Sequence, residues 1–148
     1  MKILAIDPGA SGGIAWCDDE NNVQAIAMPE TDGDLVDFLR SLRIGVGIAW
    51  VEEVGGFIGR PQPGSAMFKF GFGAGVIRGA LMALGFRVEL VRPQKWQKHF
   101  SLGAKKDCQT GSEWKNKLKA EAQRKFPDLS VTLKTADALL ILDYAMHQ

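Results

Sequence analysis

Cysteine and histidine are scarce in this chain of 148 residues. The two cysteines, Cys17 and Cys108, lie far apart and form no CxxC motif, and the two histidines are His99 and His147. So few soft ligands, without metal-ligand spacing, argue against a zinc site. Because the cysteines indicate no disulfide framework, we expect both thiols to be reduced and the protein to be cytoplasmic.

Long uninterrupted apolar runs are also missing. The longest run, 68–86, contains many glycines and is broken by Lys69 and Arg78, so we predict that it does not span a membrane. The start of the chain leads directly into a short strand, which is unlike a signal peptide. We find no repeat, low-complexity tract or internal linker, so residues 1–148 are predicted to form one domain.

Charge is segregated along the chain, although the net charge is only +1. Residues 1–53 hold three basic and ten acidic residues, whereas residues 87–125 hold eleven basic and four acidic ones. This pattern suits a protein that gathers a metal at one place and binds a polyanion at another. Two solvated faces that cancel explain the charge pattern equally well.

The hydrophobic pattern predicts an α/β fold. Three antiparallel strands are expected at 2–6, 12–17 and 23–28, before a helix that ends near residue 42. The continuous apolar run 44–51 is typical of a strand buried on both faces. The remaining expected elements are helices at 65–84, just after Pro93, at 112–126 and at 135–147, and a strand at 87–91. Together they predict a mixed five-stranded sheet with helices on both faces.

An acidic residue, Asp7, ends the first predicted strand and leads into a turn that contains Pro8-Gly9 and Gly12-Gly13. Two chemistries use such an element: a carboxylate that binds a catalytic divalent metal, and the phosphate-binding hairpin of sugar-kinase and actin-like ATPases. Those ATPases need two domains to close around a nucleotide. The length of this chain therefore favours the metal and argues against a nucleotide cofactor.

Further acids lie at the end of the fourth predicted strand, Glu52 and Glu53, and in the first turn of the last predicted helix, Asp137. If the first and fourth strands are neighbours, one glutamate lies beside Asp7, and two close carboxylates need a cation between them. Each acid alone has a structural explanation, as a turn residue, a solvated strand end or a helix-start charge. Three acids from separate elements favour a metal site.

Four motifs carry a resemblance to a known family. They are Ile-Asp-Pro-Gly at 6–9 with Gly12-Gly13, Val-Glu-Glu-Val at 51–54, Ser-Ala-Met-Phe-Lys-Phe-Gly at 65–71 and Ala-Asp-Ala-Leu-Leu-Ile at 136–141. In this order and spacing, the chain resembles the RuvC-like Holliday junction resolvases of the RNase H superfamily. The segment 92–100 looks like the region before the basic helix in phage-type members. The resemblance implies an RNase H-like fold over nearly the whole chain.

The resemblance also implies that Asp7, Glu52 and Asp137 are the catalytic, metal-binding carboxylates. Glu52 is preferred because the family's acid directly follows the aliphatic residue, here Val51, while strand alternation keeps Glu53 open as an additional ligand. The chain departs from the family at Lys134, where a fourth ligand is usual. Asp143 cannot easily replace that ligand, because six residues along a helix turn it well away from Asp137.

The implied activity is Mg²⁺-dependent endonuclease cleavage of Holliday junctions. Two Mg²⁺ ions, for which Mn²⁺ should substitute, would promote hydrolysis to a 5′-phosphate and a 3′-hydroxyl. The alternatives are a nuclease of the same fold for other branched DNA or structured RNA, and a catalytically impaired junction-binding protein.

A small-residue seam at Gly71, Gly75 and Gly79 in an almost wholly apolar helix fits a homodimer, and burial beneath the C-terminal helix is the competing explanation.

Basic residues of the second half are predicted to contact DNA phosphates. Those selected are Lys95, Lys98, Lys105, Lys106, Lys115 and Lys119. Lys134, or one of Lys105 and Lys106, is a candidate for charge neutralisation in the transition state. In the loop after the glutamates, Phe57 is placed to stack on a base and Arg60 to contact the backbone, unless Phe57 folds onto the core. Trp96 and Trp114 are expected to be packing residues.

Overall fold

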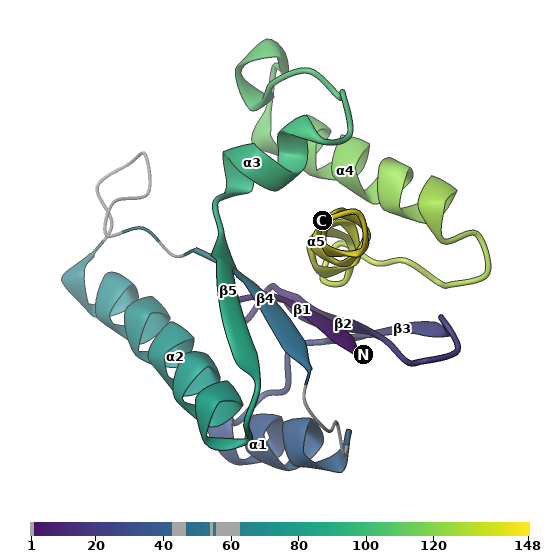
Figure 1. The fold of residues 1–148 in the computed structure, drawn as a ribbon. Helices are drawn as coiled ribbons and strands as arrows, with labels where there is room; N and C mark the ends of the chain where they lie inside the picture. The colour runs from purple at the N-terminus through teal and green to yellow at the C-terminus, as the bar shows by residue number, and fades with distance from the viewer. Residues whose placement is uncertain (1, 43–46, 54, 56–62) are drawn as a thin grey trace.

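The structure is a computed structural model that describes residues 2–42, 47–53, 55 and 63–148. Its centre is a five-stranded sheet in the order β3-β2-β1-β4-β5 (Figure 1). The strands are β1 (Ile3–Asp7), β2 (Gly13–Cys17), β3 (Val23–Ala27), β4 (Ile48–Glu52) and β5 (Arg87–Val91). The first three strands pair antiparallel, and β4 pairs parallel with both β1 and β5. The predicted mixed sheet is therefore confirmed.

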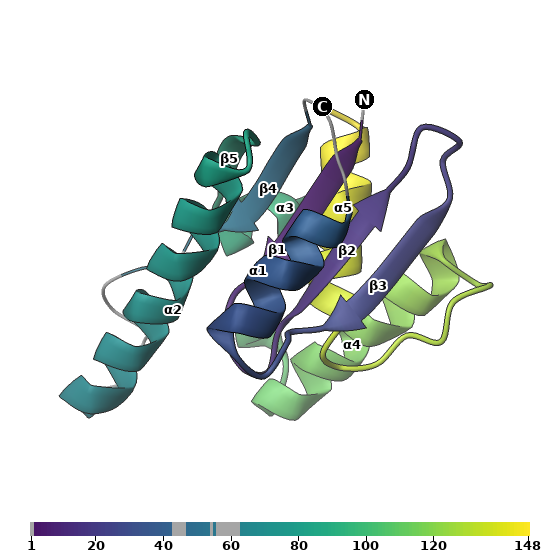
Figure 2. The ribbon, with the colours of Figure 1, turned by 90° about the horizontal axis from the view of Figure 1, so that it is seen from below.

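Helices cover both faces of the sheet (Figures 1 and 2). One face carries α1 (Asp32–Ser41) and α2 (Gly64–Ala83). The other carries α3 (Pro93–Lys98), α4 (Gly111–Lys125) and α5 (Ala136–Met146). A short 3₁₀ turn at Lys105–Asp107, which the sequence analysis did not predict, lies between α3 and α4. The helix boundaries agree with the predicted ones to within a residue or so.

Strand alternation divides the core into two layers. Leu4, Ile6 and Val51 point toward α1 and α2, where they pack with Leu39 and Leu81. The intervening strand residues belong to the opposite layer, beneath α3, α4 and α5. Residues at alternate positions of one strand therefore face different helices.

Helix α5 is the central helix of the second layer. Nine of its eleven residues are buried, because the sheet lies on one side and α4 on another. Ala5 of β1 and Trp50 of β4 belong to the same apolar cluster as Leu139 and Leu142. This packing accounts for a helix that is apolar almost all round. It also fixes the first turn of α5 against the sheet.

The fourth strand differs from the predicted one. The expected range was 44–51, whereas β4 spans Ile48–Glu52, and residues 43–46 lie outside the described part of the chain. Burial alternates along β4, so that Ala49 and Val51 are buried while Trp50 and Glu52 are only partly buried. Glu52 is thus the last residue of a paired strand rather than a residue beyond it.

Helix α2 is more exposed than its composition predicts. Only Ile77 and Leu81 are buried, whereas the side chains of Phe68, Phe72 and Met82 are largely exposed. Burial of α2 beneath the C-terminal helix is wrong, because α2 and α5 lie on opposite faces of the sheet. The apolar outer face of α2 is not covered by any described part of this chain.

By length and composition alone, α2 would also suffice to cross a membrane. Its inner side, however, packs through Ile77 and Leu81 on the sheet. Such a helix is weak evidence for a span, since core helices of globular proteins pass the same test. The absence of a membrane-spanning segment stays a prediction from the sequence.

Gly13 is required where β2 passes the start of α5. A Cβ atom there would collide with the carbonyl oxygen of Lys134 and lie 2.7 Å from that of Ile26.

We expect Gly13→Ala to destabilise the protein by about 1–3 kcal/mol, because two backbone segments must move. Gly73→Ala in α2 is the control, since a Cβ there has nothing within 4 Å. This variant should gain about 0.5–1 kcal/mol. Urea unfolding measures both, and equal stabilities would contradict the expectation.

Candidate active site

Strand pairing places Asp7 and Glu52 next to each other. In the parallel ladder Ala5 pairs with Trp50 and Ile6 with Val51, so the next positions along the two strands are Asp7 and Glu52. Both continue the face of Ala5 and Trp50, which is covered by α5. Two carboxylates therefore converge at the carboxyl ends of two central parallel strands.

Asp137 joins them from the first turn of α5. The turn before the helix is closed by Ala136 N donating to Thr132 O at 3.0 Å, and Thr132 N donates to the Thr135 hydroxyl at 3.0 Å. Thr135 and Ala136 are buried, so the start of the helix is held in place. The three acids line one cleft of about 1150 Å³.

The three carboxyls affect one another electrostatically. Burial, followed by the charges of Glu52 and Asp137, raises the pKa of Asp7 to about 8. Burial also raises the pKa of Glu52 to about 7, against a hydrogen bond from Trp96 that lowers it. Burial likewise raises the pKa of Asp137. A bound cation would stabilise the ionised forms of these three partly buried acids.

The donor set fits a hard divalent cation. All three groups are carboxylates, and oxygen ligands of this kind suit Mg²⁺ and Mn²⁺. The turn after Asp7 is closed by Gly12, which donates its N–H to Gly9 O at 3.0 Å, and Gly9 has a positive φ of 108°. A Cβ at Gly12 would collide with the carbonyl oxygen of Asp7.

Trp96 has a second role besides packing. The prediction that Trp96 and Trp114 are packing residues is confirmed, since they are 0% and 3% exposed. The indole N–H of Trp96 also donates to Glu52 Oε2 at 2.7 Å. This bond orients the carboxylate and favours its charged form. A buried indole N–H usually has a partner, but no sequence pattern indicates that Glu52 is the partner.

Glu53 is held differently from Glu52. Its backbone N–H donates to Val91 O at 2.8 Å, and its carboxylate forms an ion pair with Arg92 Nε at 2.9 Å. Glu53 lines the cleft, but an arginine already satisfies its charge. The geometry therefore favours Glu52 as the partner of Asp7, with Glu53 beside it.

The cation that acts on the acids is Lys115. Its charge lowers the pKa of Asp7, of Glu52 and of Asp137. Lys115 lies on α4 and lines the cleft, whereas Lys134 is exposed and is not a lining residue. Sequence reasoning chose Lys115 only as a phosphate contact, because the packing of α4 beside the acids is a tertiary feature.

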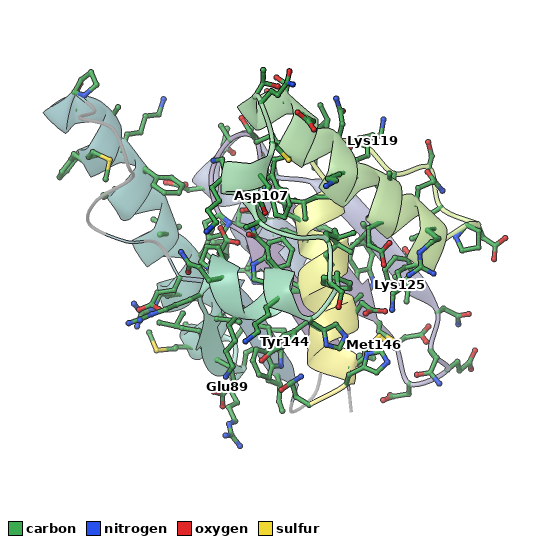
Figure 3. All side chains as sticks on the ribbon, turned by 90° about the horizontal axis from the view of Figure 1, so that it is seen from above. Glu89, Asp107, Lys119, Lys125, Tyr144 and Met146 are labelled. Carbon is green, nitrogen blue, oxygen red and sulfur yellow. The ribbon has the colours of Figure 1, made fainter. Side chains whose placement is uncertain are left out.

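The predicted DNA contacts divide into two groups. Lys98, Lys105 and Lys115 line the cleft, while Lys95, Lys106 and Lys119 lie outside it. Figure 3 shows Lys119 on α4. Phe57 and Arg60 lie outside the described residues. Sequence reasoning missed Phe70 of α2 and Arg92, which also line the cleft.

Stability of the metal-free protein should fall as the pH rises from 3.8, the ordinary pKa of Asp7, to about 8, its pKa in the folded protein. The folded state retains this proton where the unfolded chain has lost it, so unfolding becomes easier across that window. Asp7→Asn should flatten the slope, and Mg²⁺ should restore stability near the upper limit. Urea unfolding at several pH values measures this. Asp37→Asn, on the exposed side of α1, is the control, and an unchanged slope in Asp7→Asn would contradict the interpretation.

Trp96→Phe should weaken Mn²⁺ binding by about tenfold or more, because Glu52 loses the donor that orients it. Trp16→Phe is the matched control, since Trp16 packs edge-on against Phe38 in the other core layer. Electron paramagnetic resonance of free Mn²⁺ gives both affinities without requiring activity. Equal affinities in the two variants would show that the hydrogen bond does not support metal binding.

The fold is similar to that of solved RuvC structures. The Thermus thermophilus RuvC structure matches with 17% sequence identity and a TM-score of 0.59, over 99% of this chain and 96% of that chain. The structure of T. thermophilus RuvC in complex with Holliday junction substrate matches with 14% identity and a TM-score of 0.61, over the same shares of the two chains. No protein-family model and no curated protein matches the sequence. The chain therefore has the RNase H-like fold found in RuvC.

Proposed function

We propose that this protein is a structure-selective, divalent-metal-dependent endonuclease that cuts Holliday junctions. The observation that carries the proposal is the convergence of Asp7, Glu52 and Asp137 in one cleft, with raised pKa values and Lys115 beside them. The shared fold adds support, since one similar structure is of RuvC with Holliday junction substrate. We also place the protein among the phage-type members and in the cytoplasm.

In the proposed mechanism, the carboxylates of Asp7, Glu52 and Asp137 would hold Mg²⁺ or Mn²⁺. When bound, such ions would supply Lewis-acid activation of water and charge stabilisation for hydrolysis of a phosphodiester to a 5′-phosphate and a 3′-hydroxyl. Trp96 holds Glu52 in a fixed orientation through its indole N–H. Lys115 is better placed than Lys134 to neutralise charge on the attacked phosphate, because it acts electrostatically on all three acids.

The basic residues of the cleft wall would bind the DNA backbone. Arg92, Lys98, Lys105 and Lys115 all line the cleft with the acids. Such contacts position the substrate without reading its sequence. Selectivity would then depend on the shape of branched DNA, and the same geometry would serve other branched DNA or structured RNA.

A homodimer is part of the proposal. The outer face of α2 exposes Phe68 and Phe72, whose rings are 6.1 Å apart, and Met82. Burial of such an apolar helix face against a second copy of the chain would be favourable. A two-fold dimer would present two clefts, which suits symmetric cleavage of opposed strands.

One observation keeps a second function open. Lys134 stands where RuvC-like resolvases usually have a fourth ligand, so a catalytically impaired junction-binding protein is the alternative. In that case the cleft would bind the junction and the acids would not support cleavage.

The test is cleavage of a synthetic immobile four-way junction and a linear duplex of matched sequence, with Mg²⁺, Mn²⁺ or EDTA. We expect paired symmetric nicks in the junction alone, which EDTA abolishes and Asp7→Asn reduces at least about a thousandfold, since a ligand to the metal is lost. Asp19→Asn, in the exposed turn between β2 and β3, is the control and should cleave normally.

Junction binding without nicks in any metal would contradict the endonuclease and support the binding protein. Equal cleavage of the duplex would contradict selectivity for the junction.

A further inference from the structure

The two histidines of the chain meet at one buried carboxylate. His99 follows α3, Asp143 lies in α5 and His147 follows α5. One ligand atom from each lies within 4.8 Å of the others. In the sequence His99 lies far from Asp143 and His147, which are four residues apart. The sequence argued against a zinc site because the two histidines are far apart and no CxxC motif is present. The fold brings them together.

Asp143 is the central group of this cluster. It is 8% exposed, and its Oδ2 atom is buried without a hydrogen-bond partner among the residues that the structure describes. Three nitrogens surround Oδ2: Lys125 Nζ at 3.2 Å, His99 Nε2 at 3.6 Å and His147 Nδ1 at 3.8 Å. Charge-assisted hydrogen bonds are usually shorter than any of these distances. The carboxylate oxygen thus faces basic groups without being tightly bonded to one.

The imidazole rings are held in place. His99 packs edge-on against Phe100 and Tyr144, with ring centroids 5.0 and 5.7 Å apart, and lies 5.4 Å from the His147 ring. His147 Nδ1 is 2.6 Å from the backbone carbonyl oxygen of Asp143. When Nδ1 donates to that carbonyl, Nε2 carries the lone pair that a metal requires. Both side chains are partly exposed, so an ion can reach them from solvent.

We propose that His99, Asp143 and His147 form a second metal site, which takes one first-row transition-metal ion such as Zn²⁺. Two imidazoles and one carboxylate suit such a borderline ion and leave a fourth position for water. The site differs in chemistry from the acid cluster, whose ligands are oxygens alone. It is also separate in space, because Asp143 lies six residues beyond Asp137, a rise of about 9 Å along the helix.

Binding would connect the end of α3 to the end of α5. Trp96, which donates to Glu52, lies in α3 one turn before His99. An ion on His99 would therefore fix the helix that orients a residue of the acid cluster. Figure 3 shows Lys125 of α4 near the end of α5 that carries Tyr144 and Met146.

Lys125 would compete with this ion for the carboxylate of Asp143. Its ammonium lies 3.2 Å from Asp143 Oδ2 and 5.6 Å from the centroid of the Phe100 ring. A metal ion must displace this charge or share the carboxylate with it. Removal of the charge should therefore favour the metal, whereas loss of either histidine should weaken binding. If these residues formed only a network of ion pairs, neither substitution would change metal binding in this way.

The experiment uses the full chain with Asp7→Asn and excess Mg²⁺, so that the acid cluster does not take the added metal. Calorimetry with Zn²⁺, and visible absorption with Co²⁺ as a spectroscopic probe, give the affinity and the coordination. We expect one ion per chain, bound at least about tenfold more weakly in His99→Gln and in His147→Gln. Lys125→Met should bind severalfold more tightly, and Lys119→Met on the same helix should not differ.

Thermal unfolding provides a second measurement. Zn²⁺ should raise the melting temperature of the parent protein and of Lys125→Met, but not of His99→Gln. Zn²⁺ affinity that is the same in the parent and in a variant lacking both histidines would overturn the proposal. So would a Co²⁺ spectrum unaffected by both histidine substitutions. Neither readout needs DNA or nuclease activity, so the result is independent of the proposed function.

Discussion

The parallel pairing of β1 with β4 is the interaction on which the candidate site depends. Its register brings Asp7 beside Glu52 on the face of the sheet that α5 covers, where both carboxylates are partly buried. Burial raises their pKa values, and their proximity adds to the rise for Asp7. The free energy of packing in the sheet thus offsets the cost of holding like charges together, and a cation would lower that cost.

Helix α5 completes the arrangement from the other direction. Its buried side chains fill the space above β1 and β2, and the same packing positions Asp137 and Asp143 at different points along one rigid element. Asp137 lies with the other acids, where only oxygen ligands are present. Asp143 lies with two imidazoles and an ammonium. One helix therefore supports two polar clusters of different chemistry.

Local patterns in the sequence predicted most of the strands and helices, and they singled out the three acids that the fold brings to one cleft. The apolar runs and the turn at Pro8-Gly9 predicted the strands, and the position of each acid at the end of an element predicted convergence. The choice between Glu52 and Glu53 needed the register of β4, which alternation alone does not fix. The pairing of Glu53 with Arg92 joins residues from two strand ends and has no local signal.

Other features depended on tertiary packing. The hydrogen bond from Trp96, the approach of Lys115 and the meeting of His99 with His147 all join separate elements. The composition of α2 suggested burial on two sides. The sheet buries only one side of the helix, and Phe68 and Phe72 on the other side stay exposed. The hydrophobicity of a helix face indicates that its burial is favourable. It does not indicate which surface buries that face.

The two layers of the core have a consequence for how such a protein can change. Asp7, Glu52 and Asp137 are carried by the sheet and by a helix whose side chains are almost all buried, so substitutions around them disturb packing. Part of the cleft wall consists of exposed side chains on α3 and the turn after it, such as Gln94, Lys98 and Lys105. We expect these exposed residues to be replaceable with little loss of stability. The chemistry of the cleft and the shape of what it accepts can therefore evolve separately.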